Sequence, residues 1–269
     1  ITAKLSVLDN NKLAKMDLKN EKEANLALEK IRNSNFNITK ISTKRVRRNP
    51  MPPFTTSTLQ QEASNKLGFG ASRTMRIAQK LYEGINIGSE TTGLITYMRT
   101  DGVQLSTQAI DELRSEITNL HGKEYIPQSP RIYKSKAANA QEAHEAIRPT
   151  AISRHPESMS SYLDAEQLKL YELIWRRTIS SQMQSAELDE TAADISNENK
   201  SIVFRANGSQ VHFPGFFIYR DRDDDKILPH LIENENVGLE KTDGEQHFTQ
   251  PPPRYTDASL CLLYTSPSP

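Results

Sequence analysis

Residues 49–53, NPMPP, separate two kinds of sequence pattern. On their N-terminal side, Phe36, Ile38 and Ile41 alternate with polar and β-branched residues, as in a strand. On their C-terminal side, apolar residues repeat with the period of about 3.6 that is typical of helices. Proline lacks an amide hydrogen and disfavours a helical conformation of the preceding residue, so this cluster interrupts regular structure. We therefore place a domain boundary at these prolines.

The chain before the proline cluster predicts a strand, a helix and a second strand. Residues 3–9 (AKLSVLD) have strand character, and residues 21–31 carry their apolar side chains on one helical face. Residues 36–46 form the alternating segment. This order favours a small β-rich domain at the start of the chain.

Three amphipathic helices are predicted after the proline cluster. Ser72 can cap the first, whose buried stripe includes Tyr82, and Ser106 can cap the second. The third begins at Asp164, with Gln167 at the capping-box position. Residues 50–184 are therefore expected to form a mainly α-helical domain.

Extended segments return after this helical block, at residues 191–195, 201–206 and 211–219. Because strands flank the helices on both sides, the fold class that we predict is multidomain α+β. A β-rich domain, made of residues 1–49 and 185–246, is interrupted by the inserted helical domain of residues 50–184.

The composition excludes several classes of protein. The 269 residues include 34 basic and 34 acidic ones, which argues against a strongly basic polymer binder or an acidic tail protein. No apolar run is long enough for a membrane span, so we expect a soluble, cytoplasmic protein without a membrane partner. The single cysteine, Cys261, excludes a disulfide or a cysteine-based zinc site within this chain. The start at Ile1 and the proline-rich end lead us to expect a fragment.

The segment 93–102, GLITYMRTDG, places Tyr97 two residues before Arg99. A tyrosine hydroxyl attacks phosphorus well only if the charge that develops on the phosphate is neutralised, and a guanidinium can do this. The pair would suit cleavage of a phosphodiester. Spacing alone leaves the simpler alternative open, in which the tyrosine packs and the arginine is a surface charge.

Residues 96–101, TYMRTD, resemble the active-site signature of bacterial type IA DNA topoisomerases, and the topoisomerase I branch in particular. Other segments are similar to family segments and occur in the family's order: 52–61 (PPFTTSTLQQ), 66–70 (KLGFG), 140–149 (AQEAHEAIRP), 173–176 (LIWR) and 252–260 (PPRYTDASL). The last of these favours topoisomerase I over the decatenating topoisomerase III relatives.

The resemblance implies an ATP-independent enzyme that relaxes negatively supercoiled DNA. One strand is cut through a covalent 5′-phosphotyrosine, another strand passes through the gap, and the break is religated. Tyr97 would be the nucleophile, Arg99 would position or neutralise the scissile phosphate, and His144 would support DNA binding and cleavage. The partner would be DNA, with a single-stranded segment at the gate, and the protein would be a monomer.

The same resemblance implies a Mg²⁺ ion held by an acidic triplet and a separate glutamate in a toprim domain. The nearest candidate here, Asp221-Arg222-Asp223, has Ile227 where the glutamate should stand. We therefore expect no metal ligands in this chain, with those for Mg²⁺ lying outside it. The chain alone should bind DNA weakly and should not relax it.

Four further predictions on DNA contacts keep an alternative. Thr56 and Thr58 can donate hydrogen bonds to phosphate oxygens, but their run can equally cap a helix. Arg148 is a candidate DNA contact, with a salt bridge to Glu142 or Glu145 at least as plausible.

His144 would be an ordinary surface histidine of a helix over 141–147 without the family match. The basic residues 44–48 can follow a DNA backbone or form a solvated strand end.

The family likeness also suggests roles for the domains. The β-rich domain would be an arch that acts as a hinge, the helical domain would carry the tyrosine, and residues 247–260 would begin the return into a base domain. Residues 261–269 depart from the family pattern, and we treat them as an aberrant tail. The competing interpretation of the whole chain is a non-catalytic DNA-binding or strand-gate module.

Overall fold

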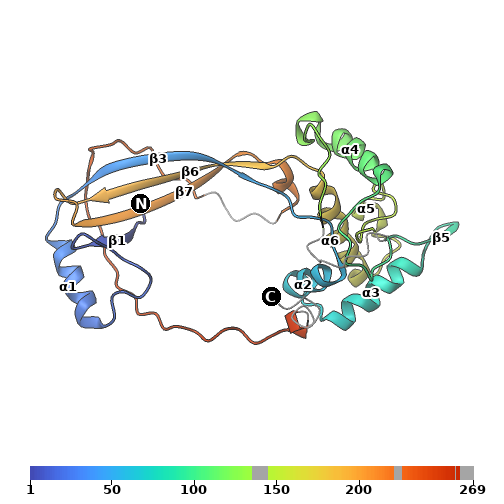
Figure 1. The fold of residues 1–269 in the computed structure, drawn as a ribbon, viewed down its shortest axis with the longest axis horizontal. Helices are drawn as coiled ribbons and strands as arrows, with labels where there is room; N and C mark the ends of the chain where they lie inside the picture. The colour runs from blue at the N-terminus through green and yellow to red at the C-terminus, as the bar shows by residue number, and fades with distance from the viewer. Residues whose placement is uncertain (135–144, 221–225, 258, 261–269) are drawn as a thin grey trace. The chain divides into compact units, whose positions relative to one another are not determined.

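The computed structural model describes residues 1–134, 145–220, 226–257 and 259–260. The chain forms two compact units (Figure 1). Unit 1 contains Ile1–Arg48, Ala186–Pro214 and Arg222–Pro252, and unit 2 contains Asn49–Ser185, Gly215–Asp221 and Pro253–Pro269. The chain therefore crosses between the units directly before the proline cluster and again after residue 185.

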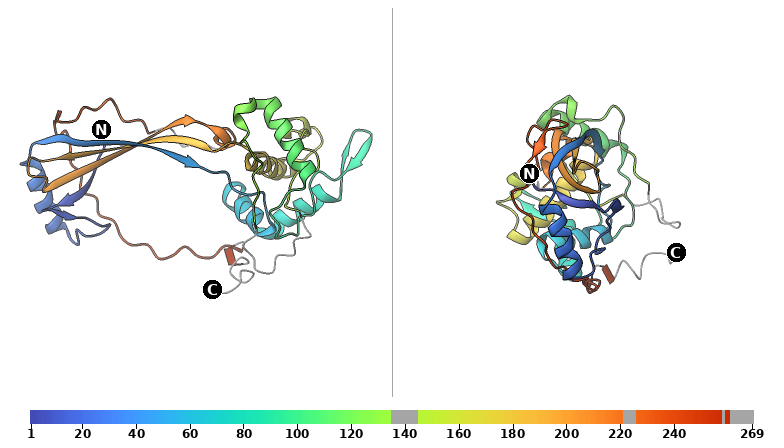
Figure 2. Two further views of the ribbon diagram at one scale, coloured as in Figure 1. Left: turned by 45° about the horizontal axis from the view of Figure 1, so that its top comes forward. Right: turned by 90° about the vertical axis from the view of Figure 1, so that its left-hand side faces the viewer.

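Unit 1 is built on an antiparallel sheet with strand order β2-β1-β7-β6-β3-β8. Its three long strands, β3, β6 and β7, form a twisted ribbon (Figure 2, left). The strands are β1 (Lys4–Leu8), β2 (Asn11–Lys12), β3 (Phe36–Arg48), β6 (Ala186–Ser196), β7 (Ile202–Phe213) and β8 (Asn236–Val237).

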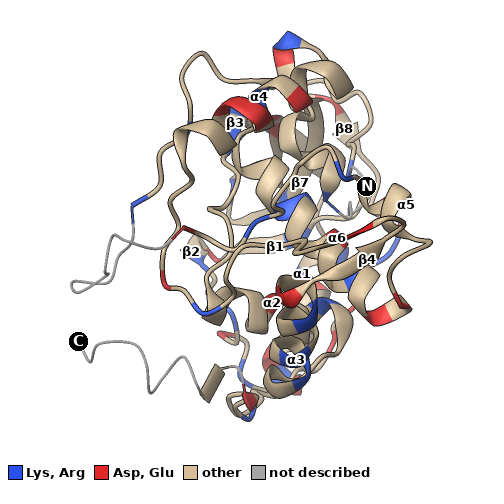
Figure 3. Ribbon diagram, turned by 90° about the vertical axis from the view of Figure 1, so that its right-hand side faces the viewer, with Lys and Arg blue, Asp and Glu red and all other residues tan. Residues whose placement is uncertain are grey.

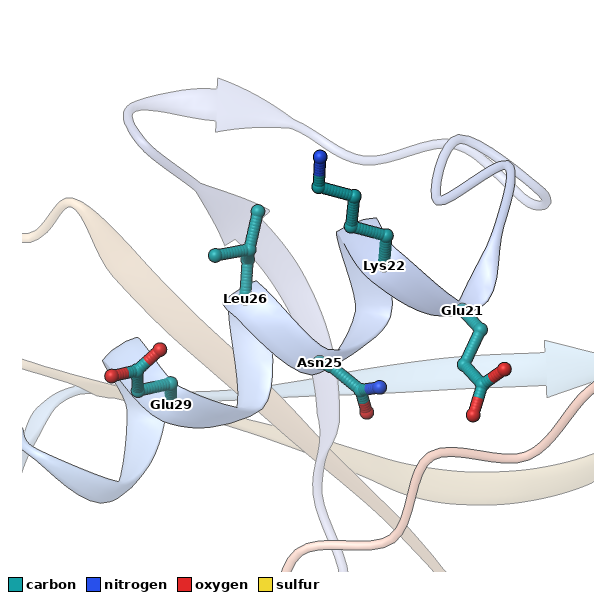
Figure 4. Close-up of a pocket in the computed structure, with 5 residues that line it drawn as sticks. All are labelled: Glu21, Lys22, Asn25, Leu26 and Glu29. Atoms are coloured by element: carbon teal, nitrogen blue, oxygen red, sulfur yellow. The ribbon is translucent and has the colours of Figure 1, made fainter.

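The apolar core of unit 1 lies near the start of β3. Helix α1 (Glu21–Arg32) precedes this strand in the chain and contributes Ile31 to the core. The buried members of this core are Ile31, Phe36, Ile38, Ile195 and Ile202. A hollow lies on the surface of α1. The side chains that line this hollow all come from this one helix and extend outwards from the helix (Figure 4). We assign no function to that hollow.

The other end of β3 is largely exposed, and its basic residues face acidic residues on β6. Arg45 forms a bidentate pair with Asp189 at 3.0 and 3.1 Å. Arg47 pairs with Glu187 at 2.9 Å, and Arg48 with Glu190 at 2.8 Å. Exposed cross-strand pairs of this kind stabilise a sheet only weakly, because water screens the two charges. The solvated strand end is thus the structure adopted by residues 44–48, with its charges neutralised within the sheet.

Unit 2 contains five α-helices in the described part of the chain. They are α2 (Thr56–Leu67), α3 (Ala71–Glu83), α4 (Thr107–His121), α5 (Pro156–Met159) and α6 (Ala165–Ser181). A short hairpin follows α3, formed by β4 (Ile85–Ile87) and β5 (Glu90–Thr92). Two 3₁₀ turns, η1 (Lys123–Tyr125) and η2 (Gly215–Tyr219), complete the unit. Acidic and basic residues are interspersed along its helices (Figure 3).

Helix α6 lies at the centre of the core of unit 2. Leu170, Tyr171 and Ile174 are fully buried. The polar atoms that are buried with this helix have partners, since the Tyr171 hydroxyl donates to the carbonyl of Arg154 at 2.7 Å and the Trp175 indole N–H donates to the carbonyl of Ile152 at 2.8 Å. The buried hydroxyl of Tyr171 and the buried indole N–H of Trp175 are therefore both satisfied within the core of unit 2.

The predicted helix starts are partly confirmed. Ser106 caps α4, and Asp164 forms a capping box with Gln167 at the start of α6. The prediction for Ser72 was wrong, because the N-cap of α3 is Gly70, two residues earlier, which offers no side-chain cap. Tyr82, predicted on the buried stripe of that helix, is 40% exposed.

The predicted strand over 211–219 was also wrong. Strand β7 continues without interruption to Phe213, because it pairs with β6 along its length. The segment after Pro214 turns into η2 at Gly215, whose φ is +48° and where a Cβ atom would lie only 2.4 Å from the carbonyl oxygen of Gln184 and 2.6 Å from that of Ser185. A left-handed residue pressed on two carbonyls ends the strand and requires glycine.

Within the described ranges, no helix combines the length and the apolar character that crossing a membrane requires.

Candidate active site

Tyr97 and Arg99 lie in an irregular segment of unit 2 and are both exposed. Their neighbours Ile95 and Met98 are 1% exposed, whereas Tyr97 is 44% exposed. The buried neighbours anchor the backbone in the core, so that the phenol and the guanidinium face solvent. In the described part of the chain, neither group takes part in a hydrogen bond or an ion pair. Within the described ranges, the phenol hydroxyl and the guanidinium are therefore unpaired.

Thr96 anchors the segment on the N-terminal side of Tyr97. Its amide donates to the carbonyl of Arg148 at 2.8 Å, and its hydroxyl donates to the carbonyl of Ala146 at 2.7 Å. The same hydroxyl accepts from the amide of Arg148 at 3.0 Å. Residues 145–150 are thereby fixed next to the tyrosine, 50 residues away in sequence.

Thr56 anchors the segment on the C-terminal side of Arg99. Its hydroxyl donates to the carbonyl of Met98 at 2.8 Å and accepts from the amide of Thr100 at 2.8 Å. The carbonyl of Thr100, 3.1 Å from this hydroxyl, also accepts from the Thr56 amide at 2.9 Å. The hydroxyl predicted to donate to a phosphate is thus used within the chain.

Thr58 takes part in the start of α2. Thr55 is the N-cap, its hydroxyl accepts from the Thr58 amide, and the Thr58 hydroxyl accepts from the Thr55 amide at 2.9 Å. This reciprocal pair is a capping box. Of the two predicted roles for this run, the structure shows the helix cap.

The C-terminal end of α3 supports Tyr97 from another direction. The Leu94 amide donates to the carbonyl of Leu81 at 2.7 Å. The ring of Tyr82 meets the ring of Tyr97 edge-to-face, with centroids 5.4 Å apart and planes at 65°. This contact was not predicted from the sequence. The available signal was the position of Tyr82 in the last turn of the helix, beside the following segment.

Arg148 forms the predicted salt bridge with Glu145. Its Nη2 lies 2.9 Å and its Nε 3.1 Å from the same carboxylate oxygen, and its Nη1 donates to the carbonyl of Pro149 at 2.9 Å. Burial opposes ionisation of Glu145, but hydrogen bonds from Ser106 together with Arg148 outweigh it and lower the pKa of this carboxyl. The guanidinium is largely buried and already paired, so the structure favours the salt-bridge alternative over a DNA contact.

His144 lies outside the described residues. The expected helix over 141–147 is not formed in its described part, residues 145–147, since Ile147 makes an antiparallel bridge with Phe54. The segment that follows His144 is therefore hydrogen-bonded to two other segments. The Ile147 amide donates to the carbonyl of Phe54, and the carbonyl of Arg148 accepts from the Thr96 amide.

The residues that the structure describes do not fit a Mg²⁺ site. Among the described residues, no group of three His, Cys, Asp or Glu side chains is placed to hold a metal ion. Asp223, part of the acidic turn considered above, lies outside those residues. We therefore assign no catalytic role to a metal ion bound by these residues.

Comparison with known proteins gives a consistent result. The sequence model of a family described as DNA topoisomerase matches residues 1–263. The chain is 53% identical to DNA topoisomerase 1 of Rickettsia bellii, with 96% of this chain and 33% of the relative covered. It is 46% identical to DNA topoisomerase 1 of Xylella fastidiosa, again with 96% and 33% covered.

A solved structure, full-length topoisomerase I from Thermotoga maritima, matches with a TM-score of 0.77 at 33% identity. The match covers 96% of this chain and 40% of that protein. The chain thus shares the mixed α/β fold of a type IA topoisomerase I, and it spans about a third of the length of the curated relatives named above. By these matches, the chain belongs to the DNA topoisomerase family.

Proposed function

We propose that this chain supplies the DNA-cleaving tyrosine of a type IA topoisomerase that relaxes negatively supercoiled DNA without ATP. The observation that carries the proposal is the exposure of Tyr97 and Arg99 on a segment whose flanking residues are buried and hydrogen-bonded. A preorganised nucleophile beside a free cation is what phosphodiester cleavage requires.

In the proposed step, the Tyr97 oxygen bonds to the phosphorus of one DNA strand and the bond from phosphorus to the 3′ oxygen breaks. The phenol loses one proton and the departing 3′ oxygen gains one, so the step needs no co-reactant. The product is a 5′-phosphotyrosine, which conserves the energy of the broken phosphodiester. Religation reverses the same step, which is why no ATP is needed.

Arg99 is assigned the neutralisation of the charge that builds on the attacked phosphate. Its guanidinium has no internal acidic partner in the described ranges, in contrast to Arg148, which is paired with Glu145. A planar guanidinium binds two phosphate oxygens at once, which a lysine does not do. His144 is proposed as a further DNA contact on the strength of the family motif alone.

We also propose the wider organisation that the family likeness implied. Residues 1–49 and 185–246 would be the hinge domain, the inserted helical domain of residues 50–184 would carry the active-site tyrosine, and residues 247–260 would lead towards a base domain. The enzyme would act as a cytoplasmic monomer on a single-stranded segment of DNA. Any Mg²⁺ would be held outside this chain, since the described residues form no site for it.

The test is a chimera in which this chain replaces the corresponding third of Rickettsia bellii DNA topoisomerase 1. With Mg²⁺ and a negatively supercoiled plasmid, the chimera should relax the DNA, Tyr97→Phe should abolish relaxation, and Arg99→Ala should slow it by about 10²- to 10³-fold. Relaxation that survives Tyr97→Phe would overturn the proposal.

The alternative function, a non-catalytic DNA-binding or strand-gate module, applies to the chain when it is separated from the rest of the protein. It is favoured for the isolated chain because the described residues lack a metal cluster. A chimera that binds the plasmid without ever cutting it would extend this alternative to the whole protein.

A further inference from the structure

We propose that Thr56 is a positioning residue for strand cleavage, which clamps the backbone on both sides of Arg99 and so fixes the guanidinium relative to Tyr97. The inference rests on the proposed function of Tyr97 and Arg99. It gives Thr56 a role in the reaction that involves no contact with DNA.

The clamp consists of contacts to the two residues that flank Arg99. The Thr56 hydroxyl lies 2.8 Å from the carbonyl oxygen of Met98 and 2.8 Å from the amide nitrogen of Thr100. The Thr56 amide adds a backbone hydrogen bond to the carbonyl of Thr100 at 2.9 Å. Both peptide groups of Arg99 are thereby connected to one side chain, although Arg99 itself is exposed.

The element that carries the clamp is rigid. Thr56 is the first residue of α2, and the start of this helix is held by the backbone hydrogen bond from the Leu59 amide to the Thr55 carbonyl at 2.9 Å, which does not involve the Thr58 hydroxyl. Leu59, one turn along, is fully buried in the core of unit 2. A side chain on an anchored helix end can hold an irregular loop in one conformation, whereas the loop has no regular hydrogen bonding of its own.

The chemistry of the hydroxyl excludes the simpler role of a phosphate donor. A threonine hydroxyl has one hydrogen to donate, and here that hydrogen points to the carbonyl of Met98 or Thr100. Donation to a phosphate would release one side of the clamp. The same atom also accepts from Thr100, so both functions of the hydroxyl are committed to the loop.

The variants that test the clamp differ in one group each. Thr56→Val keeps the shape and removes the hydroxyl, while Thr56→Ser keeps the hydroxyl. Thr58→Val is the matched control, because it removes a hydroxyl from the same helix start that contacts only Thr55. Each is measured in the Rickettsia bellii chimera by single-turnover cleavage of an oligonucleotide labelled at its 3′ end, with Kd for the same oligonucleotide measured separately.

We expect Thr56→Val to slow cleavage by about 10- to 100-fold with little change in Kd, since small misplacements of catalytic groups cost factors of this size. Thr56→Ser should restore most of the rate. Thr58→Val should lower the thermal stability but leave the cleavage rate within about 3-fold. A Thr56→Val enzyme that cleaves at the parental rate, or a Thr58→Val enzyme that loses as much, would overturn the inference.

A second measurement separates this inference from the proposed function. In the 269-residue chain, amide hydrogen exchange at Thr100 should become faster in Thr56→Val and stay unchanged in Thr58→Val, because only Thr56 accepts from that amide. Unchanged exchange in Thr56→Val would show that the clamp is absent. An unsubstituted chimera that never cleaves DNA would instead count against Tyr97 as the nucleophile, whatever the exchange result.

Discussion

Tyr97 owes its direction to its neighbours more than to its own contacts. Ile95 and Met98 are buried, and the backbone between them is held by side chains from two other segments. The phenol itself touches the edge of Tyr82 and otherwise faces solvent. Removing its hydroxyl should therefore change stability by less than about 0.5 kcal/mol, which makes Tyr97→Phe a clean test of chemistry.

Gly93 is required where the chain, after the hairpin of β4 and β5, passes close to the last turn of α3. A Cβ atom at this position would lie 2.5 Å from the carbonyl oxygen of Tyr82, which belongs to the backbone. Gly93→Ala should therefore reduce the free energy of unfolding by about 1–3 kcal/mol, as overpacking does. Gly238→Ala is the control, because a Cβ there meets nothing within 4 Å. Equal urea midpoints for the two variants would contradict the close approach.

The pair formed by Glu145 and Arg148 should make stability depend on pH. The pKa of Glu145 in the folded state is below its ordinary value of 4.5, so its contribution is complete above that pH and is lost as the pH falls through the folded value. Glu145→Gln should cost about 1 kcal/mol at neutral pH, and this cost should shrink as the pH falls below 4.5 and Glu145 becomes protonated in the folded state. Urea titrations at several pH values measure this.

The control for that prediction is Glu90→Gln, which removes the carboxylate of a more exposed ion pair with Arg154. Its cost at neutral pH should be about 0.5 kcal/mol or less. A Glu145→Gln cost that is the same at neutral and acidic pH would show that the carboxylate charge contributes nothing.

At the level of elements, the start of α6 offers a test of the capping box. Asp164 accepts from the amides of Glu166 and Gln167, and the Gln167 side chain accepts from the Asp164 amide. Asp164→Ala should cost about 1 kcal/mol in thermal or urea unfolding. Ser72→Ala should cost nothing, because Ser72 lies inside the first turn of α3 and is not its cap. A larger cost for Ser72→Ala than for Asp164→Ala would reverse these assignments.

Elements with local signals could be predicted from the sequence. Ser106 and Asp164 mark helix starts through side chains that reach only two or three residues along the chain, so the sequence contains the whole interaction. The end of β7 could not be placed in this way. It depends on pairing with β6 and on the contact of Gly215 with Gln184, both of which are set by the fold.

At the scale of the whole molecule, the candidate site also combines features with a local sequence signal and features that depend on the fold. Tyr97 and Arg99 could be proposed as a candidate pair because they are two residues apart in one recognisable segment. Thr56 is 42 residues from Met98, and its hydroxyl gives no sign in sequence of whether it faces a phosphate or the backbone. The charge of the basic residues 44–48 was visible in the sequence, but its neutralisation was not. Their acidic partners lie about 140 residues away on β6.

The most direct test of the account is to capture the covalent intermediate. The Rickettsia bellii chimera is mixed with a single-stranded oligonucleotide, denatured during cleavage and digested, and the DNA-linked peptide is sequenced by mass spectrometry. We predict that the peptide contains residues 93–102 with the 5′ phosphate of the DNA attached to Tyr97, and that it is absent from the Tyr97→Phe protein. DNA attached to any other residue, or an adduct that persists in Tyr97→Phe, would contradict the central claim.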